Sequence, residues 1–155
     1  MFGPPGHAYV YLVYGMYDCL NIVTEPEDHP AAVLVRAVAP LEGIELMRES
    51  RSALHATRRK TPGRGALGSL PDHRLASGPG LVAAAFGIDM TWTGTDLCDP
   101  ASPLRLENTP EGDPAPVVHA TPRIGIAYAG APWTEHAWRF VIEGHASASG
   151  PASLR

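Results

Sequence analysis

The chain has 155 residues, the length of one domain, and is long enough to bury a substantial core. Hydrophobic residues make up 45% of it, which excludes intrinsic disorder, and Gly and Pro, at 16 residues each, predict many loops. The formal net charge of −4 excludes a uniformly basic nucleic-acid-binding protein, although a local basic face remains compatible with it.

The first part of the chain predicts three strands. Residues 8–14 and 19–24 are rich in β-forming residues, and Gly15 and Asp18 lie between them, which predicts a hairpin. Residues 31–38 predict a third, largely buried strand.

Two helices are predicted next. The first begins at Pro40, with Leu41, Ile44, Met47 and Leu54 near one face, and the second begins at residues 77–80 and ends at Gly87. Strand pieces follow at 117–120, 123–126 and 138–142. We expect an α+β fold: a loop-rich single domain over 1–144 with a curved, mostly antiparallel sheet and a few packed helices, then a disordered tail over 145–155.

No membrane or secretion signal is recognisable in the sequence. The longest uncharged apolar windows, 8–17 and 75–88, are too short to cross a bilayer, and residues 1–7 do not resemble a signal peptide. Cys19 and Cys98 lie far apart, which fits a reducing compartment. We therefore expect a cytoplasmic protein.

Charge is distributed unevenly along the chain. Between Arg48 and Arg74 seven basic residues face two acidic ones, whereas between Asp89 and Asp113 six acidic residues face one basic residue. The basic stretch either meets a polyanion or is simply a solvated loop, and charge alone favours the solvated loop.

Four of the five tyrosines lie within nine residues of the predicted hairpin: Tyr9, Tyr11, Tyr14 and Tyr17. Tyr9 and Tyr11 share one strand face, and Tyr14 lies where the turn begins. A phenol at a turn suits stacking on a base, which contributes roughly 1–3 kcal/mol per base. Core packing is the better interpretation for Tyr9.

Polar residues within apolar stretches are candidate site residues. Asn21 needs a hydrogen-bond partner or a pocket. Arg36 either pairs with a carboxylate in the core or faces a cavity that receives an anion. The helix that starts at Gly78-Pro79-Gly80 can bind a phosphate through backbone amides. Seven histidines show no zinc-ligand spacing, so no metal site is expected.

Several stretches, in the same order along the chain, together resemble the alkyladenine (3-methyladenine) DNA glycosylase family. The longest is Tyr-Val-Tyr-Leu-Val-Tyr-Gly-Met-Tyr-Asp-Cys-Leu-Asn-Ile at 9–22. The others are 33–37, 40–43, 77–80, 122–125, 128–130 and 138–140. The resemblance covers nearly the whole chain to about residue 144.

The resemblance implies a monofunctional, monomeric DNA glycosylase of base-excision repair, associated with the nucleoid. Such an enzyme flips an alkylated purine out of duplex DNA and hydrolyses its N-glycosidic bond without metal or cofactor. By matching positions, Tyr14 is implied to be the wedge that fills the gap, and Tyr11 a wall of the base pocket. Met16 lies near the wedge, Asn21 excludes the exocyclic amine of normal guanine, and Arg36 supports catalysis by holding the flipped nucleotide.

In this family the general base is a glutamate of a Glu-Ala-Tyr motif, and that motif precedes the stretch matched by Met1-Phe2-Gly3. We therefore expect an N-terminally truncated member that is a very poor enzyme, because a positioned base contributes about 10²–10⁴-fold. Three hypotheses remain: a complete enzyme with a misplaced start, an inactive short form that binds distorted duplex DNA without base release, and a small structural domain with a Tyr-rich core.

Overall fold

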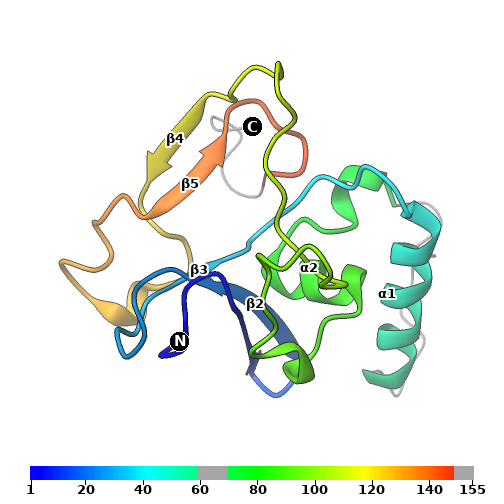
Figure 1. Ribbon diagram of the computed structural model, residues 1–155, viewed down its shortest axis with the longest axis horizontal. Coiled ribbons are helices and arrows are strands. Elements are labelled where there is room, and N and C mark those ends of the chain that lie inside the picture. The colour runs from blue at the N-terminus through cyan, green and yellow to red at the C-terminus, as the bar shows by residue number, and fades with distance from the viewer. Residues whose placement is uncertain (59–69, 149–155) are drawn as a thin grey trace. The chain divides into compact units, whose positions relative to one another are not determined.

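The computed structural model describes residues 1–58 and 70–148 (Figure 1). The chain divides into two compact units, unit 1 (Met1–Asn108) and unit 2 (Thr109–Arg155). The predicted α+β class with antiparallel sheets is confirmed. Most of the predicted tail lies outside the described residues, and His145–Ala148 form a turn in which the N–H of Ala148 donates to the carbonyl of His145. None of the described helices is long and apolar enough to cross a membrane.

Unit 1 contains a three-stranded antiparallel sheet of β1 (Ala8–Val13), β2 (Tyr17–Val23) and β3 (Ala32–Leu34), in that order. The predicted hairpin is confirmed, with Val10 opposite Leu20 and Tyr11 opposite Cys19. Opposed residues point to the same side of a sheet. One face therefore carries the apolar Val10–Leu20 pair, and the other face carries Tyr11 and Cys19.

The third strand is shorter than the sequence predicts because the chain leaves the sheet after Leu34. The N–H of Val35 still donates to the carbonyl of Leu20 at 3.0 Å, but Ala37 forms an isolated bridge with Ser77. Residues 35–38 thus change partner from β2 to the segment before the second helix, which places Arg36 between the two.

A glycine precedes each helix of unit 1, and a glycine also ends the second helix. Helix α1 (Ile44–Arg58) begins four residues later than predicted, because Gly43 has a φ of +67° that is incompatible with a helix, and Leu41 is therefore 89% exposed. Helix α2 (Pro79–Phe86) ends at Gly87, whose φ of +64° is the left-handed conformation of a C-terminal cap.

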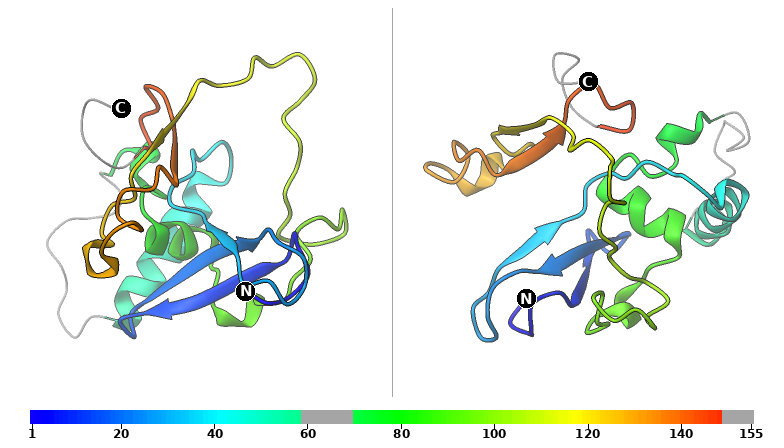
Figure 2. Two further views of the ribbon diagram at one scale, coloured as in Figure 1. Left: turned by 90° about the vertical axis from the view of Figure 1, so that its left-hand side faces the viewer. Right: turned by 45° about the horizontal axis from the view of Figure 1, so that its top comes forward.

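Helix α2 lies between the sheet and α1 (Figures 1 and 2). One buried cluster joins its Ala83 to β1, β2 and the loop after the helix: Ala8, Val10, Leu20, Ala83, Ile88 and Leu97. A second joins α2 to α1: Met47, Leu75, Ala76, Val82 and Ala85. Two 3₁₀ helices, Asp72–Arg74 and Met90–Trp92, lie in the loops before and after α2.

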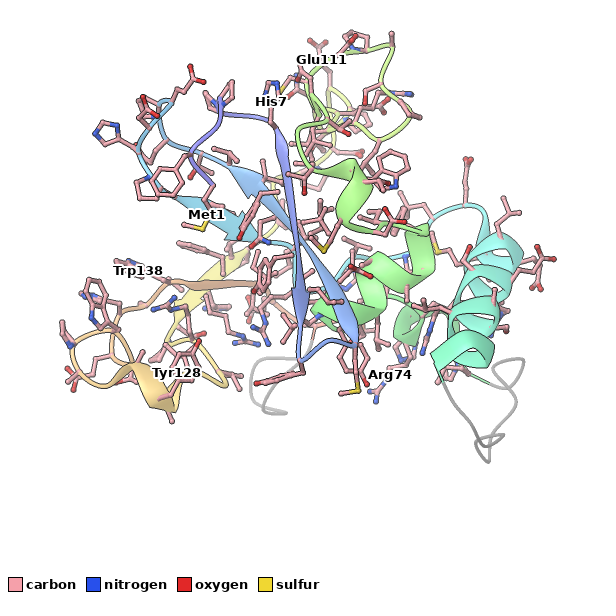
Figure 3. All side chains as sticks on the ribbon, turned by 90° about the horizontal axis from the view of Figure 1, so that it is seen from below. Met1, His7, Arg74, Glu111, Tyr128 and Trp138 are labelled. Carbon is pink, nitrogen blue, oxygen red and sulfur yellow. The ribbon has the colours of Figure 1, made fainter. Side chains whose placement is uncertain are left out.

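Unit 2 is built on the antiparallel pair β4 (Val118–Thr121) and β5 (Arg139–Ile142). The loop that joins them contains the 3₁₀ helix Ala127–Ala129. The same loop carries both Tyr128 and Trp138 (Figure 3). The strand predicted at 123–126 does not form. There the guanidinium of Arg123 lies 5.2 Å from the ring centroid of Trp138 and donates to the carbonyl of Trp133, so this segment is held by side-chain contacts.

Candidate functional site

The turn between β1 and β2 presents an exposed aromatic side chain. The N–H of Met16 donates to the carbonyl of Val13 at 3.0 Å, and the two central residues, Tyr14 and Gly15, have φ values of +53° and +66°. Positive φ at both central positions defines a type I′ turn, which matches the twist of a hairpin. The side chain of Tyr14 is 85% exposed and that of Met16 is half exposed. The structure thus places Tyr14 at the turn, as the sequence predicts.

Side-chain contacts tie together the sheet face that carries Tyr11. The rings of Tyr9 and Tyr11 stack with centroids 5.7 Å apart and planes at 28°. Asn21 is buried, and its side-chain amide donates to the carbonyls of Tyr9 and Cys19, both at 3.1 Å. The amide that the sequence left in need of a partner therefore ties the side chain of Asn21 to both strands of the hairpin.

Arg36 is half-buried, and its Nε is buried without a hydrogen-bond partner. Among residues 1–58 and 70–148 no carboxylate forms an ion pair with it, so the core ion pair considered above is not found there. Burial raises the pKa of the Cys19 thiol most strongly, Asp18 raises it further, and the positive charge of Arg36 lowers it. Arg36 is therefore a cation beside the same sheet face, with an unused donor.

A recess of about 370 Å³ opens between the hairpin turn and the start of α2, and we call it the hairpin recess. Its lining is almost entirely apolar: Val13, Tyr14, Tyr17, Cys19, Gly78, Pro79, Gly80 and Leu81. Binding pockets for small molecules commonly have volumes of about 300–1,000 Å³. The recess is thus large enough for a planar ring.

The start of α2 is largely satisfied within the chain. Pro79 has no N–H, and the N–H groups of Leu81 and Val82 both donate to the carbonyl of Gly78 at 2.9 Å. Phosphate binding by Gly78 and Gly80 stays a prediction.

Part of the basic stretch has a structural role. Arg48 donates to the carbonyl of Leu70 at 2.9 Å and pairs with Asp72, and Arg51 donates to the carbonyl of Leu75 at 3.0 Å. These contacts attach α1 to the segment that leads into α2. The centre of the basic stretch, 59–69, lies outside the described residues. Within the described parts of the chain, no three His, Cys, Asp or Glu side chains come close enough to hold a metal ion.

Sequence reasoning gave no role to Tyr17 and no steric role to Gly80, although both line the hairpin recess. The two-residue period of β2 places Tyr17 on the same face as Cys19 and Asn21, and this signal was available from the sequence. The approach of Gly80 to that face was not, because it depends on how α2 packs against the sheet.

The sequence pattern of methylpurine-DNA glycosylases matches residues 1–146. The chain belongs to the methylpurine-DNA glycosylase family. The family resemblance drawn from the sequence is thereby confirmed.

Three family members illustrate the similarity. A candidate 3-methyladenine DNA glycosylase of Methanocella arvoryzae is 44% identical over 140 residues, which cover 90% of this chain and 60% of that protein. Another candidate, from Nitrosospira multiformis, is 41% identical over 97% of this chain and 65% of its own length. The DNA-3-methyladenine glycosylase of Mus musculus is 43% identical over 93% of this chain and 40% of its own length. The chain thus spans 40–65% of the length of these methylpurine-DNA glycosylase relatives.

Proposed function

We propose that this chain supplies the DNA wedge and the base-recognition face of a glycosylase that acts in base-excision repair. The reaction is hydrolysis of the N-glycosidic bond of an alkylated purine, of the 3-methyladenine type, after the nucleotide flips out of duplex DNA. The observation that carries the proposal is the exposed ring of Tyr14, held on a tight turn beside an apolar recess of ring size. The family match and the names of the relatives support it.

Each proposed contact follows from the chemistry of the flipped nucleotide. The gap left in the duplex needs a flat apolar filler, and Tyr14 is exposed for insertion. The flipped base needs a flat wall, and Tyr11 is backed by Tyr9. Asn21 is fixed by two hydrogen bonds and so cannot move aside for an extra exocyclic amine. Arg36 is a cation beside this face, and a positive charge suits the anionic backbone of the flipped nucleotide.

A second candidate function is damage-specific DNA binding without base release. On this alternative the wedge, the pocket wall and Arg36 act as above, and the protein holds distorted duplex DNA as a monomer without hydrolysing it.

Binding and base release are measured separately, each on its own DNA substrate. Fluorescence anisotropy compares an undamaged duplex with one that carries a tetrahydrofuran abasic-site analogue, and chromatography detects purines released from methylated DNA. We expect preference for the damaged duplex, lost in Tyr14→Ala and retained in Tyr128→Ala, a matched control because Tyr128 is 87% exposed in unit 2. Equal affinity for both duplexes would contradict the proposal. Base release above background supports the glycosylase function. Binding to the damaged duplex without base release supports the second candidate function.

A further inference from the structure

Gly80, in the first turn of α2, lies unusually close to Tyr17, the first residue of β2. A methyl group at position 80 would lie 2.9 Å from Cδ1 of Tyr17, 3.0 Å from its Cβ and 3.1 Å from its Cγ. Rotation of the phenol ring moves neither its Cβ nor its Cγ. A larger residue at position 80 must therefore displace the start of β2 or the start of α2. This contact requires a glycine for a steric reason.

Each partner of this contact belongs to an element that is attached to the rest of unit 1. Tyr17 is paired with Val13 across the hairpin, immediately next to the turn that carries Tyr14. Gly80 is followed by Val82 and Ala83, which are buried in the two hydrophobic clusters. The Tyr17–Gly80 contact thus joins the end of the hairpin to the most buried helix of unit 1.

We infer that Tyr17, packed against Gly80, is a positioning residue that fixes the direction of the Tyr14 wedge. A hairpin end without such support bends freely, and a ring that enters stacked bases must be held in one direction. Tyr14, Tyr17 and Gly80 also line the same recess, so a shift of Tyr17 changes the wall beside the wedge. The inference rests on the proposed function, because it assigns a support to the wedge of that function.

The test measures wedge insertion separately from DNA affinity and from folding. The probe is a duplex with one tetrahydrofuran abasic-site analogue beside 2-aminopurine, whose emission reports on its stacking. The amplitude at saturating protein gives the insertion equilibrium, the titration midpoint gives affinity, and thermal unfolding gives stability. A residue with only a structural role changes the unfolding curve and leaves the amplitude at saturation unchanged.

Four variants of the full chain isolate the contact. We expect Gly80→Ala and Tyr17→Ala each to lower the insertion equilibrium constant roughly fivefold or more, the range of an overpacked or lost contact. Tyr17→Phe keeps the ring and retains the signal. The double variant Tyr17→Ala/Gly80→Ala lowers the constant at least as much as Tyr17→Ala alone, because the ring is gone and a Cβ at position 80 still lies 3.0 Å from Cβ of residue 17. Gly3→Ala is the matched glycine control, since a Cβ there meets no atom within 4 Å.

The outcomes separate this inference from the proposed function. If Tyr14→Ala abolishes the amplitude but Tyr17→Ala and the double variant keep it, the positioning role is wrong and the proposed function stands. If the unaltered protein gives no amplitude, or if Tyr14→Ala keeps it, the wedge and its support both fail. If Gly80→Ala does not fold, Tyr17→Phe and Tyr17→Ala decide the question without it.

Discussion

Replacing Tyr14 with Asn is expected to stabilise the fold while abolishing recognition of damaged DNA. Tyr14 occupies the first central position of a type I′ turn, with a φ of +53°. Asn followed by Gly is the preferred pair at these two positions, because Asn tolerates the left-handed region. The native turn therefore carries an aromatic residue in a conformation that its own backbone disfavours.

The magnitude follows from two opposing contributions. A non-glycine residue in the left-handed conformation costs about 1–2 kcal/mol, most of which Asn avoids. The Tyr14 side chain is 85% exposed, so its loss uncovers roughly 30 Å², which contributes about 0.8 kcal/mol. Tyr14→Asn should therefore change stability by about 0 to +1 kcal/mol. Tyr14→Ala loses the same contact but keeps the backbone strain, and should destabilise by about 0.8 kcal/mol.

The comparison of the two variants is the sharp measurement. We expect Tyr14→Asn to melt roughly 2–8 °C above Tyr14→Ala, at about 2–4 °C per kcal/mol for a chain of this length. The same pair of substitutions at Tyr128 is the control, since Tyr128 is equally exposed and does not have a positive φ. Equal melting temperatures for Tyr14→Asn and Tyr14→Ala would refute the reasoning about backbone strain. Both variants should lose the preference for the abasic duplex.

Four further predictions follow from buried and charged residues. Arg36→Ala should lower the slope of log affinity against log salt concentration by about 0.9, measured by anisotropy, and an unchanged slope argues against a phosphate contact. Iodoacetamide should modify the exposed Cys98 before Cys19, because burial and the charge of Asp18 raise the pKa of the Cys19 thiol; mass spectrometry decides the order. The pKa of the Cys19 thiol is therefore higher in the folded protein than in the unfolded chain. The contribution of Cys19 to the free energy of unfolding is fully present below the unfolded-state pKa. It is lost as the pH rises through the folded-state pKa. Urea midpoints should fall in alkaline solution, and less so in Cys19→Ala. Leu75→Ala should cost about 2–5 kcal/mol in urea unfolding because Leu75 has 0% exposure, and a cost under about 1 kcal/mol means that the site collapses around the deletion.

Local patterns predicted the elements whose ends are set by local chemistry. The β1–β2 hairpin follows from two β-forming runs around a glycine, and α2 from a Gly-Pro-Gly start and a glycine cap. The third strand was predicted too long because Ala37 and Val38 bond instead to the segment at Ala76 and Ser77. This exchange of partners depends on tertiary packing. The sequence does not show it, because the apolar run continues unchanged through the point where the chain leaves β2.

The candidate site was predictable where one residue is unusual in its own segment. Tyr14 at a turn, Asn21 in an apolar strand and Arg36 between apolar neighbours each conflict with their surroundings, and such conflicts are where functional residues are expected. The contact of Tyr17 with Gly80 joins residues far apart in sequence and conflicts with nothing locally. The role of Arg48 could not be predicted, because a basic residue in a charged stretch can face solvent or donate a hydrogen bond to a backbone carbonyl. In the structure it donates to the carbonyl of Leu70.

The small side chains of α2 have a consequence for how unit 1 opens. With eight residues, α2 is too short to persist alone, so its hydrogen bonds depend on burial. Ala83 belongs to the cluster beneath the sheet, whereas Val82 and Ala85 belong to the cluster against α1. Neither cluster can open while the other stays closed. The amides of α2 should therefore exchange with solvent only through cooperative unfolding of unit 1.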